Sequence, residues 1–303
     1  MISAQNLTHR YGSRIALNGL DLSVVQGGIF GVLGPNGGGK STLFGILSTM
    51  ITPSQGRVEI AGFDVVRQAS DVRRQIGVVF QTQSLDRKLT VHENLTSQGH
   101  MYGLSGVALR GRIEESMQRL SIADRKDDVV DSLSGGLKRR VEIAKALLHH
   151  PRVLLMDEPS TGLDPGARRE LWQYVEELRD HHGVTVLLTT HILDEADRCD
   201  RLILLHEGRK VAEGTPAELK SKVGGDVVIF DVADPVAMAP RIEAKFAVKT
   251  HALDGALRVE IDNGHRFVTE VVEAFPGAIQ SIAMHKPTLE DVFLNETGVR
   301  IGE

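Results

Sequence analysis

The sequence predicts an α/β fold built on a mixed sheet, with a helical insertion and a smaller α+β domain after it. Three observations indicate this fold. A glycine-rich loop joins an apolar stretch, residues 28–34, to a stretch of helical spacing. A second apolar stretch ends in two carboxylates at 157 and 158, and a β-α-β-β-α-β pattern begins near residue 226. Strand, glycine loop and helix in succession are typical of sheets flanked by helices.

The larger domain is expected to cover residues 1–222, because "SKVGGD" at 221–226 has the composition of a linker. Its expected strands lie at 20–24, 28–34, 56–65, 74–81, 152–158 and 183–191, with a hairpin at 201–214. Helices are expected at 91–104, 109–122, 137–150 and 166–182. The first three fall within residues 87–150, which we interpret as a helical subdomain inserted into the sheet domain.

The accessory domain, residues 223–303, is predicted to be a small ferredoxin-like α+β module. Its hairpin is expected to turn at Asp254–Gly255, and a short helix at 288–298 closes the chain. The histidines of this domain lack the spacing of metal ligands. We expect a role in dimerisation or regulation, and the sequence leaves the choice open.

The composition is that of an ordinary globular protein. The chain has 303 residues, of which 41% are hydrophobic and 25% charged, and its formal net charge of −5 gives no overall basic surface for nucleic acid. A single cysteine, Cys199, excludes an intrachain disulfide and fits a reducing compartment. No apolar run approaches the ~18 residues of a membrane span. We therefore expect a cytoplasmic protein that reaches the membrane only through a partner.

A phosphate-binding loop is the strongest motif. Residues 34–42, "GPNGGGKST", have the spacing G-x-x-x-x-G-K-[ST] between a strand and a helix. Glycines let the backbone fold around phosphates, and the N–H groups of the loop and helix form an anion nest. Lys40 is expected to reach the β- and γ-phosphates, and the Ser41 hydroxyl to ligate Mg²⁺. The residues assigned to the nucleotide here are Gly34, Pro35, Asn36, Gly37, Gly38, Gly39, Lys40, Ser41 and Thr42.

Polar side chains follow three other strands. Asp157 and Glu158 end one strand, where α/β sheets bind ligands, so Asp157 suits the shell of Mg²⁺ and Glu158 suits polarisation of the attacking water. Neighbours on a strand point to opposite faces, so the two share one site only if the strand has ended. His191 is either structural or a γ-phosphate contact, and Gln81 is positioned to touch Mg²⁺ or water.

A second glycine pair lies in "DSLSGGLKRR", residues 131–140. Ser134, Gly135 and Gly136 precede an expected helix and offer free backbone N–H groups to an anion. Because the chain already has a phosphate loop, we interpret this stretch as half of a site that another subunit completes.

Taken together, the motifs resemble the nucleotide-binding subunit of an ATP-binding cassette (ABC) transporter. Walker A "GPNGGGKST", Gln81, the signature "LSGGL", Walker B "VLLMDE", "STGLD" and His191 occur in that order, over residues 1 to about 222. "VVFQTQSLDRKLTVHENL" and "KPTLEDVFLNETG" are similar to the drug-resistance and sodium-export branch, whose permeases are of the ABC-2 type. Two departures are Gly38, where alanine or serine is common, and Leu137, where glutamine is common.

The resemblance implies a P-loop ATPase that uses ATP and Mg²⁺ and dimerises head to tail around two ATP molecules. It places Tyr11 on the adenine, although a plain surface tyrosine is the alternative. It gives catalytic roles to Glu158, His191 and Gln81, puts Ser134, Gly135 and Gly136 against the ATP of the other copy, and puts Asp164 at the dimer seam. The subunit would lie on the inner face of the membrane, bound to a separate ABC-2 type permease.

A non-transport ABC ATPase acting in translation or DNA repair is the competing class. Such proteins carry two cassettes in one chain, a long coiled-coil insertion or basic arms. This chain has one Walker A, no sustained heptads and a negative net charge. The sequence therefore favours an exporter subunit that does not bind nucleic acid. It does not identify the exported substrate.

Overall fold

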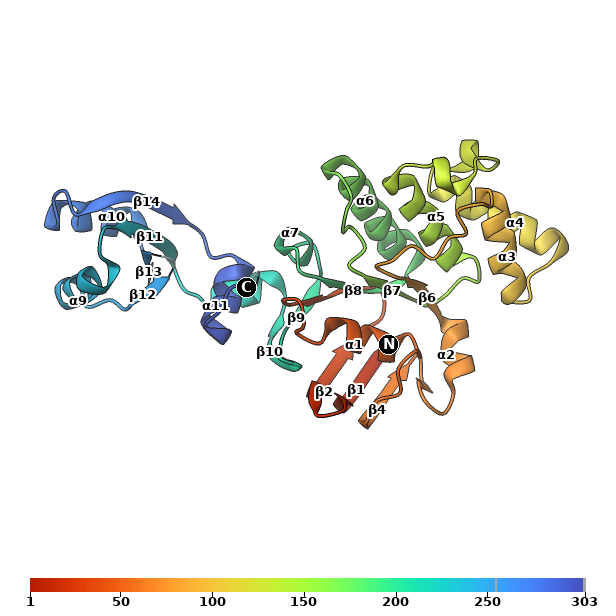
Figure 1. Cartoon of the computed structure of the whole chain (residues 1–303), viewed down its shortest axis with the longest axis horizontal. Coiled ribbons are helices and arrows are strands. Elements are labelled where there is room, and N and C mark those ends of the chain that lie inside the picture. The colour runs from red at the N-terminus through yellow and green to blue at the C-terminus, as the bar shows by residue number, and fades with distance from the viewer. Residues whose placement is uncertain (254, 302–303) are drawn as a thin grey trace. The chain divides into compact units, whose positions relative to one another are not determined.

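The computed structural model describes residues 1–253 and 255–301 and divides the chain into two compact units (Figure 1). The first unit is Met1–Glu213 and the second begins at Gly214. The expected boundary lay after residue 222. The division comes earlier because helix α8 (Pro216–Ser221) contacts helix α11 (Leu289–Thr297) of the second unit.

A six-stranded sheet forms the centre of the first unit, in the order β10-β9-β3-β8-β7-β6. Its strands are β3 (Ile29–Leu33), β6 (Ile76–Val79), β7 (Val153–Asp157), β8 (Thr185–Thr190), β9 (Arg201–His206) and β10 (Arg209–Gly214). The five strands from β9 to β6 are parallel to their neighbours. Their carboxyl ends therefore meet at one edge, and the register places Leu33 beside Thr190 and Asp157 beside Thr189.

An antiparallel sheet of order β2-β1-β4-β5 accompanies the first. Its strands are β1 (Ile2–Tyr11), β2 (Arg14–Val24), β4 (Gln55–Ile60) and β5 (Phe63–Asp64). The sequence did not predict β1. Its alternation is broken by irregular register after Ala4, where Asn6 takes a left-handed φ of 47°. The β1–β2 hairpin pairs Tyr11 with Arg14 at its turn.

The helices of the first unit are α1 (Lys40–Leu47), α2 (Ala69–Gln75), α3 (Val91–Met101), α4 (Gly106–Arg119), α5 (Gly135–Leu147), α6 (Pro165–His182) and α7 (Leu193–Ala196). Two short 3-10 turns, η1 (Ala123–Arg125) and η2 (Val130–Ser132), link α4 to α5. Helix α5 begins two residues before the expected start at Leu137. The hydroxyl of Ser134 accepts a hydrogen bond from the Leu137 N–H (3.3 Å), so Gly135 and Gly136 form the first turn.

Two apolar cores cover the two faces of the six-stranded sheet, because successive residues of each strand point to opposite sides. Leu154 and Met156 of β7 join the core formed with α3, α4, α5 and α6. Val153 and Leu155 join the core formed with α1 and the antiparallel sheet. Figure 1 shows these two layers on either side of β6, β7 and β8. The central strands are thus held rigidly from both faces.

The second unit is the expected β-α-β-β-α-β module followed by α11. Its elements are β11 (Asp226–Val232), α9 (Pro235–Phe246), β12 (Thr250–Leu253), β13 (Ala256–Ile261), α10 (Gly264–Ala274) and β14 (Ile279–His285). The strands form an antiparallel sheet of order β12-β13-β11-β14. Phe230 packs edge-to-face on Phe267, and Phe267 on Phe246. The expected turn residue Asp254 lies outside the described residues.

None of the helices in the described part of the chain has the length and apolar character that a membrane span requires.

Candidate functional site

The site is built where four parallel strands end. Strands β3, β6, β7 and β8 lead into the phosphate loop, Gln81, Glu158 and His191. All four segments were predicted to be functional, and the parallel sheet brings them to the same edge.

The phosphate loop joins β3 to α1, and its shape depends on glycine. Gly37 and Gly39 have φ values of 78° and 107°, which side chains rarely allow. A Cβ on Gly34 would lie 2.2 Å from the Leu205 carbonyl oxygen, so the loop passes too close to β9 for any other residue. A Cβ on Gly38 would lie 3.1 Å from the carbonyl oxygens of Pro35 and Leu205. The departure to glycine at Gly38 therefore relieves a tight contact.

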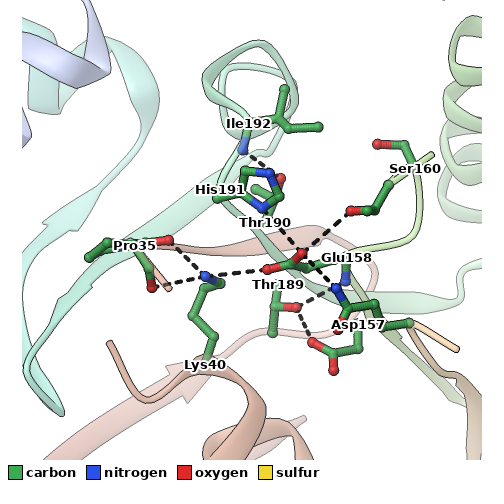
Figure 2. A network of polar contacts seen from close by, with 12 residues as sticks. Pro35, Lys40, Asp157, Glu158, Ser160, Thr189, Thr190, His191 and Ile192 are labelled. Carbon is green, nitrogen blue, oxygen red and sulfur yellow. Dashed lines mark hydrogen bonds and ion pairs between the residues drawn. The ribbon is translucent and has the colours of Figure 1, made fainter. Parts of the chain in front are cut away.

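Lys40 is buried, with 4% of its surface exposed. Its Nζ donates hydrogen bonds to the carbonyl oxygens of Gly34 (2.8 Å) and Pro35 (3.0 Å), which close the loop around the ammonium group. The same Nζ lies 3.3 Å from Oε1 of Glu158 (Figure 2). Lys40 thus joins the phosphate loop to the end of β7.

Glu158 is the centre of the polar network in Figure 2. Its Oε2 accepts a hydrogen bond from Nε2 of Gln81 (3.2 Å) and lies 3.1 Å from Nδ1 of His191. With Lys40 on Oε1, three of the predicted site residues converge on this carboxylate. Glu158 itself is 8% exposed.

The strand has ended at Asp157, so both carboxylates can serve one site. Glu158 takes a left-handed φ of 43°, a costly conformation for a side chain, which turns it out of the strand direction. Its N–H donates to the Thr189 carbonyl oxygen (3.1 Å). Asp157 accepts a hydrogen bond from the Thr189 hydroxyl (2.5 Å). Burial raises the pKa of Asp157 above its usual value, and the neighbouring Glu158 charge acts in the same direction.

A buried glutamate supports the loops that carry Glu158 and His191. Glu195, at the start of α7, is 1% exposed and accepts hydrogen bonds from the hydroxyls of Thr190 (2.7 Å) and Ser160. The Thr190 hydroxyl in turn accepts from the Ile192 N–H (2.9 Å). Sequence analysis missed Glu195, because a glutamate in a short helix has the appearance of a surface residue.

A cavity opens between the phosphate loop and the β1–β2 hairpin, lined on its other side by Gln81 and Glu158. Tyr11 faces it, half-exposed, with its ring edge-to-face on His9 at 4.6 Å between centroids. Arg14, the hairpin partner of Tyr11, also lines the cavity, and its Nη2 lies 3.6 Å from where a Cβ on Gly37 would be. Sequence analysis missed Arg14, because its link to the loop comes from strand pairing.

The signature and Asp164 lie at the starts of two packed helices. A Cβ on Gly136 would be 2.9 Å from the Cβ of Ala167, so α5 and α6 touch at their first turns. Asp164 caps α6 by accepting hydrogen bonds from the N–H groups of Gly166 (2.9 Å) and Ala167 (3.0 Å). The bond from Ala167, with that from Gly166, lowers the pKa of Asp164. Among the described residues that line the phosphate-loop cavity, none belongs to the signature or to this cap.

Within residues 1–253 and 255–301, no three His, Cys, Asp or Glu side chains are arranged to hold a metal ion. Cys199 is buried, its thiol pKa is raised by that burial, and its Sγ donates to the Glu195 carbonyl oxygen (3.5 Å). These contacts make it a structural thiol.

Comparison with known proteins gives consistent similarities. Residues 17–161 match the family model described as ABC transporter. The daunorubicin resistance ATP-binding protein DrrA3 of Streptomyces coeruleorubidus is 40% identical over 98% of this chain and 96% of its own. The Nod factor export ATP-binding protein I of Burkholderia orbicola is 39% identical over 98% and 97%. The dimeric structure of the ATP-binding cassette MJ0796 bound to ADP and Pi is 29% identical, covers 71% of this chain and 98% of that one, and has a TM-score of 0.64.

Replacement of Gly39 by alanine tests the geometry of the phosphate loop. At a φ of 107° the new Cβ would lie 2.7 Å from the Ala16 carbonyl oxygen, so the loop must shift. We expect ADP affinity to fall at least about fivefold, since such strain costs about 1–3 kcal/mol. Isothermal titration calorimetry measures the effect.

Gly62→Ala is the matched control, because Gly62 has a φ of 87° but no atom within 4 Å of its added Cβ. Equal ADP affinities for Gly39→Ala and Gly62→Ala would contradict the proposed loop geometry.

Proposed function

The chain belongs to the ATP-binding proteins of the ABC transporter family, and on this premise we propose that two copies close head to tail around two ATP molecules and power a separate ABC-2 type export permease. One observation carries the proposal. Lys40, Gln81 and His191 converge on Glu158, whereas the signature lies outside the cavity that Lys40, Gln81 and Glu158 line. One chain therefore offers most of a hydrolytic site and, separately, the missing part of another.

Nucleotide binding follows from the cavity. The N–H groups of the loop and the start of α1 receive the phosphates, and Lys40 supplies a positive charge. Tyr11 stacks on the adenine, and the guanidinium of Arg14 reaches the phosphates near Gly37. Burial of Lys40 strengthens its interaction with the phosphates, because solvent screens it little.

The residues present also suit Mg²⁺. Asp157 is a buried carboxylate that accepts a hydrogen bond from the Thr189 hydroxyl and has no cationic hydrogen-bond partner among the described residues. Mg²⁺ typically takes one or two carboxylates or hydroxyls together with substrate phosphates. Ser41, Gln81 and Asp157 would hold it, and the ion would neutralise charge on the phosphates.

Glu158 is the proposed base for the attacking water. Its carboxylate faces the cavity, Gln81 orients it by a hydrogen bond to Oε2, and His191 lies beside the same oxygen. His191 also remains in reach of the γ-phosphate, being half-exposed at the end of β8. Positioning of this kind supplies most of the acceleration in phosphoryl transfer.

The second copy completes the site. Ser134, Gly135 and Gly136 of the partner subunit present the N-terminus of α5 to the γ-phosphate, and Asp164 lies at the seam beside it. The similarity to a dimeric cassette supports this assembly.

Selection of the exported substrate is proposed to be a function of the permease. The two relatives are each about 40% identical to this chain. They are nevertheless named for different processes, daunorubicin resistance and Nod factor export. We therefore propose that this subunit supplies the energy at the inner face of the membrane and that its partner selects the cargo.

Glu158→Gln tests the base. The amide keeps the shape but cannot take a proton, so kcat should fall at least about 100-fold, within the usual worth of a general base. ATP binding should persist, and a stable ATP-bound dimer should appear in light scattering. Hydrolysis at the wild-type rate would exclude Glu158 as the base.

Ser134→Arg tests the contribution of the partner subunit. The long side chain should block the seam, so that hydrolysis falls at least about 100-fold while monomer ADP affinity stays within about twofold. ADP titration and a phosphate-release assay measure the two effects. The control is Ser221→Arg on the exposed face of α8, which should retain hydrolysis. Retained hydrolysis in Ser134→Arg would show that the signature does not contribute to the hydrolytic site.

Arg14→Ala tests the phosphate contact that strand pairing revealed. We expect ADP affinity to fall about fivefold and adenosine affinity to stay unchanged, because only ADP offers charge to a guanidinium. Arg10→Ala, on the same hairpin but outside the cavity lining, should bind both as the wild type does. Equal losses for adenosine and ADP would contradict a phosphate contact.

A further inference from the structure

A second cavity of the first unit lies at the edge of the six-stranded sheet opposite the nucleotide site. Its volume is about 350 Å³, within the ~300–1,000 Å³ of small-molecule pockets. Arg152 and Val184, which line it, directly precede β7 and β8. The cavity therefore opens at the amino ends of strands whose carboxyl ends lead into Glu158 and His191. The proposed mechanism makes no use of it.

The lining of this cavity is rich in cationic and titratable side chains. Arg119 and His182 are the last residues of α4 and α6, and His150 and Arg152 lie in the connection between α5 and β7. None of the described residues that line the cavity is acidic. Within the described part of the chain, the exposed side chains of Arg152 and His182 have neither a hydrogen-bond nor an ion-pair partner. Both are thus available to a ligand.

Capping of helix ends does not account for this cluster. Cations near a helix C-terminus commonly donate hydrogen bonds to its last carbonyl oxygens. Here Nη2 of Arg119 donates to the Glu115 carboxylate, and Nε2 of His150 lies 3.3 Å from Oε2 of the same residue. Among the described residues, none of the four lining cations donates a side-chain hydrogen bond to a helix-end carbonyl oxygen.

The positive groups act on one another, and one buried nitrogen near them has no partner. Burial lowers the pKa of His150, and the charges of Arg112 and Arg119 lower it further against the opposing Glu115. Burial and Arg119 also lower the pKa of His182. Nη1 of Arg112 is shielded from solvent and has no hydrogen-bond partner among the described residues. An anion placed between these groups would relieve their mutual repulsion.

We propose that this cavity binds a phosphate group, either of a free anion or of a lipid headgroup. Three arginines, Arg112, Arg119 and Arg152, outnumber the two carboxylates that act on its histidines, Glu115 and Glu177. A guanidinium presents two parallel N–H donors that match the oxygens of a phosphate.

The rest of the lining strengthens such a contact. Leu147, Leu178 and Val184 are apolar and less than a tenth exposed, so they reduce the screening of charge in the cavity. A phosphate that accepts hydrogen bonds from Arg119 and Arg152 would join the end of α4 to the chain just before β7.

Titration of pyrophosphate into the full chain, followed by calorimetry, tests the site. Saturating ADP first fills the phosphate loop, and the buffer lacks Mg²⁺, which pyrophosphate would chelate. The wild type should bind pyrophosphate under these conditions. Arg152→Gln should bind it at least about tenfold more weakly, because a hydrogen bond between charged groups is lost. Its ADP affinity should stay within about twofold of wild type, since the two sites lie at opposite edges of the sheet.

Arg110→Gln is the matched control, because it removes the same charge from an exposed position of α4 outside the cavity lining. It should bind pyrophosphate as the wild type does. Arg119→Gln changes the cavity from a different element and should weaken pyrophosphate binding as Arg152→Gln does.

Sedimentation with phosphatidylcholine vesicles, with and without phosphatidic acid, distinguishes the two sources of phosphate. Pyrophosphate binding that depends on Arg152 indicates a free anion. Sedimentation that needs both phosphatidic acid and Arg152, without pyrophosphate binding, indicates a lipid headgroup. Absence of both kinds of binding in the wild type, or wild-type binding in both Arg152→Gln and Arg119→Gln, would overturn the proposal.

Discussion

The buried ion pair of Lys40 and Glu158 is the contact on which the nucleotide site depends. Both groups are less than a tenth exposed, so either one alone would carry a large desolvation cost. The pair therefore requires that the phosphate loop and the end of β7 stay together. A phosphate chain would offer Lys40 a second anionic partner in the same place, and the carboxylate would then be free to act on water.

Everything else in the first unit serves to deliver these groups to one point. Parallel pairing brings the ends of β3, β6, β7 and β8 to a single edge, and two apolar cores clamp the strands from both faces. Local deviations then aim the side chains. Glu158 turns out of the strand through a left-handed φ, and buried Glu195 ties the two following loops together. The rigid sheet fixes where the site residues lie, and the loops after its strands set the direction in which their side chains point.

Sequence motifs predicted this centre well, because phosphate loops and strand-end carboxylates are read from local spacing. The fold class was confirmed, and the predicted Lys40, Gln81, Glu158 and His191 do lie together. What escaped prediction depends on distant pairing. Strand β1 has interrupted alternation, Arg14 reaches the cavity only through its hairpin, and the buried pair of Arg139 and Glu142 lies in α5 beyond the residues of the signature. The start of α5 was placed late, since capping by Ser134 outweighed the low helix propensity of two glycines.

The position of the signature explains why this ATPase would respond to ATP rather than to ADP. In the proposed mechanism, a monomer would bind the features common to both nucleotides through Tyr11, the loop and Lys40, which line the cavity. The N-terminus of α5 lies outside the cavity, and in the proposed dimer it would contribute only when a second copy presents it to the γ-phosphate. Closure is then favoured in proportion to the extra affinity for ATP in the closed state, and it is lost when the γ-phosphate leaves. Binding energy that appears only in the dimer is available to move a membrane partner.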